Sequence, residues 1–192
     1  MLDRCLSVLE IFVWVDELKT WAPPSRSAAP LPPYAYVPGA GPHPRRSPRG
    51  HSFEVSAPSE RPWEEVDSGT DERWLTAVDF YNRGFFWESH ELWEALWHGQ
   101  QRRGPEALLL KALIQTAAAH LKILQGAPRG VEILAGRSDR MLSELEALGC
   151  QDMAGFDLVS FRVRRNHWFA RALAGGHLTA ALFPFVHLEE VR

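Results

Sequence analysis

The sequence contains little cysteine and little lysine. Cys5 and Cys150 are the only cysteines, and they form neither a metal-ligand spacing nor a disulfide framework. Without such a framework or a convincing signal peptide, we expect a reduced, cytoplasmic compartment. The net charge of −3 argues against a general nucleic-acid binder.

Several motifs that would identify an enzyme class are also missing. The chain has no Gly-rich phosphate loop, no Gly-x-Ser-x-Gly nucleophile and no His-Glu-x-x-His zinc-peptidase motif. Charged or polar residues interrupt the two most apolar runs, 8–15 and 108–124, so no membrane association is expected. The second run is expected to be a buried helix.

Proline divides the chain into two parts. Eleven of the 14 prolines lie within residues 22–62, mixed with Ser, Ala, Gly and Arg. Such a segment buries too little apolar surface to offset the entropy of ordering it, so we predict disorder there, after a short helix within residues 1–21. The predicted units are therefore residues 1–62 and a helical domain over residues 63–192. A misassigned start, with residues 1–62 outside the native protein, is an equally open explanation.

The second part has clear helix boundaries and no strand alternation. Thr70 is a candidate N-cap, Pro105 and Pro128 suit first helical positions, and Gly84 and Gly149 suit positions just after a helix. The predicted helices cover about residues 71–83, 85–98, 105–125, 128–148 and 156–174, with one more turn within 178–191. We predict an all-α protein, a compact bundle of about five helices preceded by the Pro-rich segment.

The second predicted helix carries the residues with the most chemical potential. Residues four apart share one face of a helix, so His90 and Glu94 are neighbours. On a helical wheel both lie at the border of the apolar face, whereas Glu88 and Glu91 are expected to face water. The pair is therefore both shielded and reachable.

A third candidate comes from the next helix. His120 falls among apolar residues there, and burying an unpaired imidazole costs on the order of 1–3 kcal/mol. Because consecutive helices tend to pack side by side, His90 or Glu94 is a natural partner. The predicted constellation is His90, Glu94 and His120, with the outer members Asn82, Glu91 and Gln115.

Three interpretations of this constellation stay open. His90, Glu94 and His120 could bind a divalent metal, for which zinc, iron or manganese suits the ligand set. Glu94 could instead orient His90 as a catalytic general base in a pocket. The third possibility is a satisfied buried network that only fixes the register of the helices.

Aromatic and basic residues suggest two further, weaker functions. Basic and aromatic side chains alternate in residues 161–169, which could bind phosphate or RNA but more often forms an amphipathic helix with a solvated face. The tryptophans typically indicate core or interface packing, and a homodimer is one such interface.

The motif around His90 resembles a known family. Residues 80–97 read FYNRGFFWESHELWEALW, and a second block reads LIQTAAAH over residues 113–120. Both are similar to the domain of unknown function family 309, and the resemblance covers about residues 71–150. It implies a small all-helical fold and brings no established activity. The family motif maps onto His90, Glu94 and Trp97 here. Further motif or structural positions are expected at Asn82, Gly84, Glu91 and Gln115.

The leading hypothesis is therefore a small helical protein with a His/Glu pocket that binds a divalent metal and is hydrolytic. The alternative is a non-catalytic interaction module or homodimer in which His90, Glu94 and His120 form a structural polar network. The sequence alone does not decide whether the protein is an enzyme.

Overall fold

A computed structural model describes residues 16–60, 71–100 and 102–188. The elements in order are the helices and strands α2 (Glu72–Asn82), α3 (Phe86–Gly99), α4 (Gly104–Leu124), α5 (Pro128–Ala147), β1 (Asp152–Met153), β2 (Phe156–Asp157), α6 (Leu158–Leu173) and the 3-10 turn η1 (Ala180–Leu182). A short helical segment over residues 16–21 precedes them. The structure is mostly helical, which confirms the predicted all-α class.

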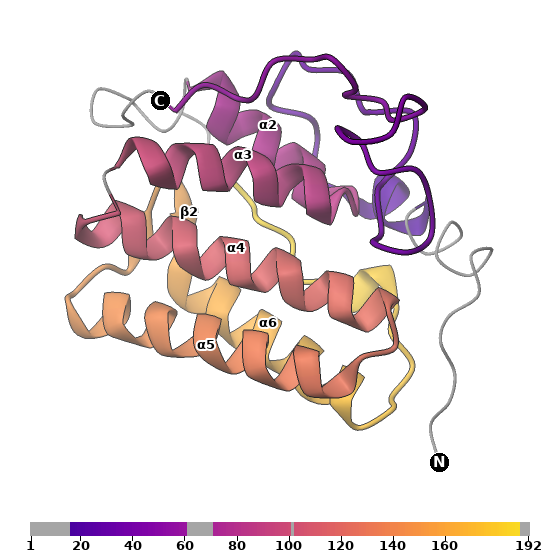
Figure 1. The fold of residues 1–192 in the computed structure, drawn as a ribbon. Coiled ribbons are helices and arrows are strands. Elements are labelled where there is room, and N and C mark those ends of the chain that lie inside the picture. Colours follow the sequence, from indigo (N-terminus) through magenta and orange to yellow (C-terminus); the bar gives the residue numbers. More distant parts are fainter. Residues whose placement is uncertain (1–15, 61–70, 101, 189–192) are drawn as a thin grey trace.

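The helices pack in chain order, each against the one before it. In Figure 1, α4 runs between α3 and α5, with α2 on the far side of α3 and α6 behind α5. Helix α4 is long and apolar enough to cross a membrane by length and composition, but most of that apolar stretch is buried in the protein. It is the central helix of the bundle, as expected for residues 108–124.

Helix boundaries follow the expected signals closely. Asp71 caps α2 by accepting hydrogen bonds from the backbone N–H groups of Arg73 and Trp74. The predicted cap, Thr70, lies outside the described residues. Gly84 follows α2 with a φ of 81°, a conformation that favours glycine. Helices α4 and α5 carry Pro105 and Pro128 in their first turns.

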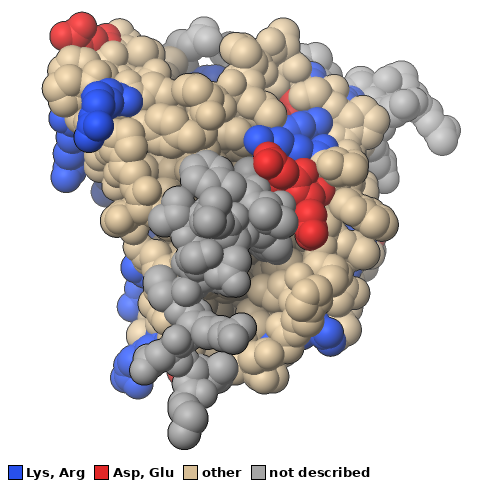
Figure 2. All heavy atoms as spheres, turned by 90° about the vertical axis from the view of Figure 1, so that its right-hand side faces the viewer, with Lys and Arg blue, Asp and Glu red and all other residues tan. Residues whose placement is uncertain are grey.

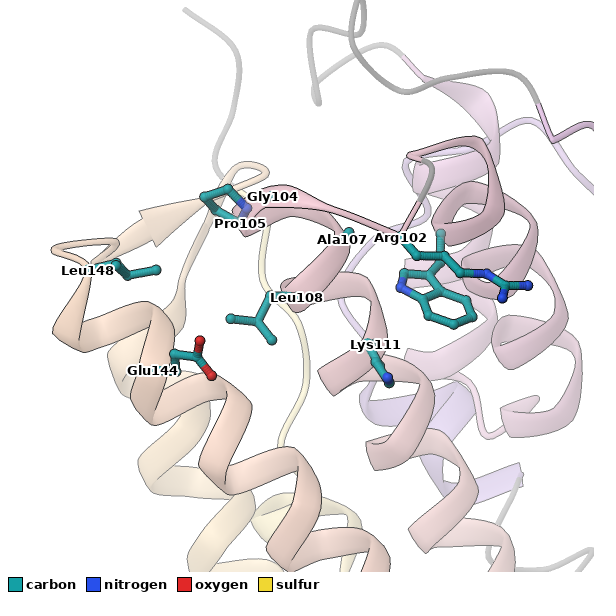
Figure 3. Close-up of a pocket in the computed structure, with 9 residues that line it drawn as sticks. Arg102, Gly104, Pro105, Ala107, Leu108, Lys111, Glu144 and Leu148 are labelled. Carbon is teal, nitrogen blue, oxygen red and sulfur yellow. The ribbon is translucent and has the colours of Figure 1, made fainter.

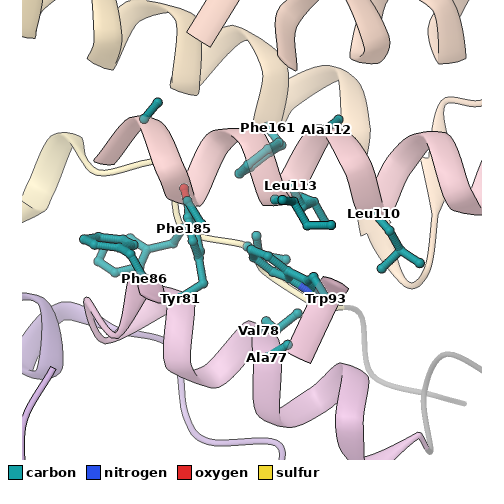
Figure 4. Close-up of a cluster of buried hydrophobic side chains, with 14 of the residues drawn as sticks. Ala77, Val78, Tyr81, Phe86, Trp93, Leu110, Ala112, Leu113, Phe161 and Phe185 are labelled. Atoms are coloured by element: carbon teal, nitrogen blue, oxygen red, sulfur yellow. The ribbon is translucent and has the colours of Figure 1, made fainter. Parts of the chain in front are cut away.

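The core is built around aromatic residues from α2, α3 and α6 that pack against α4 (Figure 4). The ring centroid of Tyr81 lies 5.5 Å from that of Trp93 and 6.4 Å from that of Phe161. Leu110 and Leu113 of α4 are fully buried beside them. Burial of each such side chain contributes roughly 1.5–3 kcal/mol, so this cluster is the main source of stability.

One short hairpin was not predicted. Strands β1 and β2 pair antiparallel, with Met153 opposite Phe156. The turn between them places Ala154 and Gly155 at positive φ. The hairpin reverses the chain between α5 and α6 and buries Phe156 against Trp74, with ring centroids 6.2 Å apart.

The Pro-rich segment has no regular helix or strand over residues 22–60, yet it follows a defined path over the helical domain (Figure 1). The backbone N–H groups of Arg26 and Ser27 donate to the Asp79 carboxylate at 2.9 and 2.8 Å. Tyr36 and Val37 are buried. Disorder therefore does not describe residues 22–60, because hydrogen bonds and buried side chains offset the ordering entropy. We call residues 34–53 the strap.

The domain boundary predicted near residue 63 lies outside the described residues. On the face shown in Figure 2, the visible Lys and Arg side chains form separate groups amid uncharged surface.

Candidate functional site

One face of α3 brings together three side chains that could hold a metal ion. Each of His90, Glu91 and Glu94 offers a ligand atom, and these atoms lie within 4.8 Å of one another. We call these residues the α3 cluster. The helix itself produces this grouping, because residues four apart are neighbours on its surface and Glu91 adjoins both. All three residues are half-buried.

The two nitrogens of His90 face different partners. Nδ1 lies 3.4 Å from the backbone carbonyl oxygen of Ile114 on α4. Nε2 lies 3.9 Å from Oε2 of Glu94, and the His90 side chain is 25% exposed. With the proton on Nδ1, the carbonyl accepts it and the Nε2 lone pair points toward the carboxylates. Metal-ligating histidines commonly show this arrangement, in which a carbonyl fixes the tautomer.

Glu91 completes the cluster and also contacts the strap. Its Oε2 lies 3.6 Å from Nε of Arg45. Burial raises the pKa of Glu91, and the neighbouring His90 and Arg45 oppose that shift. The prediction placed this carboxylate in solvent, but it is half-buried within the cluster.

His120 does not join this group, which corrects the predicted constellation. It is fully buried, stacks on Phe86 with ring centroids 4.6 Å apart, and lies 4.8 Å from the Phe169 ring. Its Nδ1 bonds to the carbonyl of Thr116 at 2.9 Å, and Nε2 has no hydrogen-bond partner among the described residues. Burial lowers the pKa of His120 to about 3, so the ring is neutral.

The physical reason for this error is rotation about the axis of α4. Apolar periodicity placed His120 correctly on a buried face, and α4 does pack beside α3. However, α4 is buried on several sides, and His120 points into the aromatic core with Tyr81 and Phe183. Ile114, about 1.7 turns earlier on α4, is the residue whose carbonyl oxygen faces His90.

Glu88 is the second correction. The wheel placed it in water, but its side chain is 4% exposed and bonds to the strap. Nε2 of His51 lies 3.0 Å from Oε1 of Glu88, and the Tyr36 backbone N–H donates to the same oxygen. Burial raises the pKa of Glu88, while the hydrogen bonds from His51 and Tyr36 oppose that shift.

Sequence reasoning missed both His51 and Arg45. They lie in the segment expected to be disordered, so neither was considered as a partner for α3. The ring of His43, also in the strap, lies 5.4 Å from that of Trp87. A sequence signal was present in the concentration of aromatic residues and histidines among the prolines of residues 34–51.

The remaining predicted residues divide between structural and open positions. The side chain of Asn82 forms two hydrogen bonds with the C-terminal segment. Its Nδ2 donates to the Val186 carbonyl and its Oδ1 accepts from the Val186 N–H, both at 2.8 Å. Gly84 is required by its positive φ. Gln115 follows Ile114, and its buried Oε1 has no hydrogen-bond partner among the described residues. Trp97 is half-buried at the end of α3.

The basic and aromatic stretch of α6 is mostly structural. Phe161, Trp168 and Phe169 are buried in the core. Nε of Arg162 bonds to Asp139 at 2.7 Å and its Nη1 bonds to Glu146 at 2.7 Å. These contacts with α5 give Arg162 a structural role.

Comparison with known proteins finds one family model that matches part of the chain. Residues 74–134 match the model described as Domain of unknown function (DUF309). This range spans most of α2, all of α3 and α4, and the beginning of α5, and so includes the α3 cluster. Neither the curated proteins nor the solved structures include a significant match.

Proposed function

We propose that this chain, whose residues 74–134 belong to the DUF309 family, binds a divalent metal through His90, Glu91 and Glu94. The observation that carries the proposal is the convergence of three ligand atoms within 4.8 Å on one half-exposed helix face. The ligand set differs from the predicted one in a single member, since Glu91 replaces His120.

The donor chemistry fits a transition metal. One imidazole nitrogen and two carboxylate oxygens suit zinc, iron or manganese. In a tetrahedral site with bonds near 2.1 Å, ligand atoms lie roughly 3–3.5 Å apart. The 3.9 Å from His90 Nε2 to Glu94 Oε2 needs only a small side-chain adjustment to reach that spacing.

One surrounding feature supports a bound cation. The Ile114 carbonyl orients the imidazole, as the outer partners of metal-ligating histidines do.

Hydrolysis is the reaction class that we propose for such a site. A metal held by His90, Glu91 and Glu94 would supply an activated water for hydrolysis. The chain's own contribution would be to position the attacking water and to accept its proton on a carboxylate oxygen. Glu94 suits this role because its side chain is 43% exposed and therefore accessible to substrate.

The test is metal content followed by titration. Protein purified without chelator is analysed by mass spectrometry for metals, then titrated with zinc and manganese by calorimetry. We expect about one metal per chain, and loss of binding in His90→Ala and Glu94→Ala. His98→Ala is the matched control, since it removes a histidine from the same helix outside the cluster. Absence of metal together with absence of binding would refute the proposal.

A reaction assay separates metal binding from hydrolysis. Activated phosphodiesters and carboxylic esters are incubated with the metal-loaded protein. We expect turnover that EDTA abolishes and that Glu94→Gln lowers when activity is expressed per bound metal. Metal binding without turnover of any ester would retain the site and reject the hydrolytic role.

A homodimer is the second candidate, and exposed apolar side chains of α6 favour it. Val159 and Val163 lie one turn apart on α6 and are 39% and 65% exposed. The structural network of His90, Glu94 and His120 no longer supports this alternative, because the three do not meet. Sedimentation velocity tests it: a dimer that Val163→Asp dissociates would support it, and a monomeric wild type would reject it.

A further inference from the structure

A surface hollow lies at the end of the bundle where α3 ends, α4 begins and α5 ends. Its volume is about 390 Å³, within the range of small-molecule sites. Figure 3 shows residues from all three helices around it. The hollow is separate from the α3 cluster and shares no residue with it.

Two cations lie near one aromatic ring in this hollow. The guanidinium carbon of Arg102 lies 4.7 Å from the Trp97 ring centroid, and Nζ of Lys111 lies 5.2 Å from it. Nη2 of Arg102 also lies 3.2 Å from Nε2 of His98. Across the described parts of the chain, neither cation forms an ion pair with a carboxylate. An anion at this end of the hollow would therefore be attracted by two unpaired positive charges.

The backbone holds Arg102 in this position at a cost. Its φ is 60°, in the left-handed region that residues other than glycine rarely adopt. Strain of this kind clusters at ligand sites, where the surrounding structure sustains it. Here it accompanies the placement of Arg102 against the tryptophan.

The rest of the lining is apolar, with one acid. Leu108 of α4 projects into the hollow, and Leu148, just after α5, is 63% exposed beside it. Glu144 of α5 lies on the opposite side of Leu108 from Lys111 and Arg102 (Figure 3). One end of the hollow is therefore positive, its middle apolar and its far end negative.

From this distribution we propose that the hollow binds a small amphipathic anion. The carboxylate of the ligand lies at the end of the hollow that Arg102 and Lys111 line, and its apolar body lies on Leu108 and Leu148. Glu144 at the far end disfavours a ligand with a second acidic group there. This site goes beyond the proposed metal function and does not require it, since none of its contacts involves the α3 cluster.

The experiment uses octanoate as the probe, with the full chain in EDTA so that no metal contributes. Isothermal titration calorimetry should show saturable binding of octanoate and none of octylamine, which has the same apolar body and the opposite charge. Arg102→Gln and Lys111→Gln should each weaken binding about five- to tenfold. Both residues are exposed, so these variants should fold, as circular dichroism will verify. Lys122→Gln, on the same helix and outside the hollow, is the matched control and should bind like wild type.

A dicarboxylate of the same length tests the far end. Suberate should bind more weakly than octanoate, and Glu144→Gln should narrow that difference. The proposal is overturned if octanoate does not saturate, if octylamine binds equally, or if the Arg102→Gln/Lys111→Gln double variant retains wild-type affinity. If Glu144→Gln changes the affinities for octanoate and suberate by the same factor, the proposed orientation of the ligand is wrong.

Discussion

Two regions of this molecule each enclose one histidine, and they use it in opposite ways. In the α3 cluster, His90 is a quarter exposed and shares a face with two carboxylates. In the aromatic core, His120 is fully buried between Phe86 and Phe169 with no carboxylate beside it. The first region keeps a polar imidazole within reach of a ligand, and the second treats the ring as one more aromatic packing element.

Residue type alone therefore does not identify a metal site. The burial of the side chain and its hydrogen-bond partners must also be known. Both histidines lie on helices that contact each other, and both were plausible metal ligands from the sequence. Burial without a counter-charge removes the cationic form of His120, and its Nδ1 is committed to a backbone carbonyl. Of these two histidines, only His90 has carboxylate oxygens around it.

The largest predicted effect is on the pH dependence of the free energy of unfolding, when His120 in the aromatic core is replaced by phenylalanine. The pKa of His120 falls from 6.5 to about 3 on folding, so the unfolded chain binds one more proton between those pH values. Stability from this group is therefore complete above pH 6.5 and is lost as the pH falls toward 3, by roughly 5 kcal/mol in total. His120→Phe should remove this loss, and urea unfolding at pH 7 and pH 4 measures it.

A second variant controls for packing in that experiment. His120→Leu also lacks a titrating group but fills less of the aromatic pocket, so it should be less stable than His120→Phe at both pH values. Both variants should show the same flattened pH dependence. If wild type and His120→Phe lose stability equally between pH 7 and pH 4, the imidazole is not held neutral by burial.

The next prediction compares two glutamates of α3 by how much their replacement lowers the free energy of unfolding. Glu88 lies under the strap, and Glu94 lies in the α3 cluster. Glu88→Ala leaves His51 and the Tyr36 N–H buried without their acceptor, which should cost about 3 kcal/mol. Glu94→Ala removes a half-exposed group and should cost no more than about 0.5 kcal/mol. Free energies of unfolding from urea titrations give both values.

The same variants test whether the strap contacts α3 in solution. If Glu88→Ala is destabilising in the full chain but harmless in a chain that begins at residue 61, the strap is the partner of Glu88. Equal, small costs for Glu88→Ala and Glu94→Ala in the full chain would indicate that the strap does not bind α3 in solution.

Local signals in the sequence predicted the fold well. Gly84, Pro105, Pro128 and Gly149 marked helix ends within a few residues, because proline and positive-φ glycine constrain the backbone regardless of tertiary contacts. The β1–β2 hairpin was missed because two paired residues per strand are too few to show alternation. The order of the strap was missed because its hydrogen bonds join residues that are far apart in the sequence, such as Tyr36 and Glu88, which are 52 positions apart.

The candidate site was predictable only where it depended on a single helix. The proximity of His90 and Glu94 follows from helical geometry and needs no tertiary information. The roles of His120 and Glu88 depended on how α4 is rotated and on what covers α3, and neither is encoded in local periodicity. The helical wheel showed which face is apolar, but not that the strap would cover a polar one.

The smallest predicted effect concerns the metal affinity of the α3 cluster. Arg45 of the strap places a positive charge 3.6 Å from Glu91, where it competes with a cation for that carboxylate. The pair is about a quarter exposed, so its strength should be that of a surface ion pair, up to about 1 kcal/mol. Arg45→Gln should therefore tighten zinc or manganese binding by roughly three- to fivefold in a calorimetric titration. Arg46→Gln changes the same charge at the neighbouring, exposed position and should leave the affinity within about twofold of wild type. Weaker binding in Arg45→Gln would mean that the strap supports the cluster, because an arginine that only competes for Glu91 cannot be needed for metal affinity.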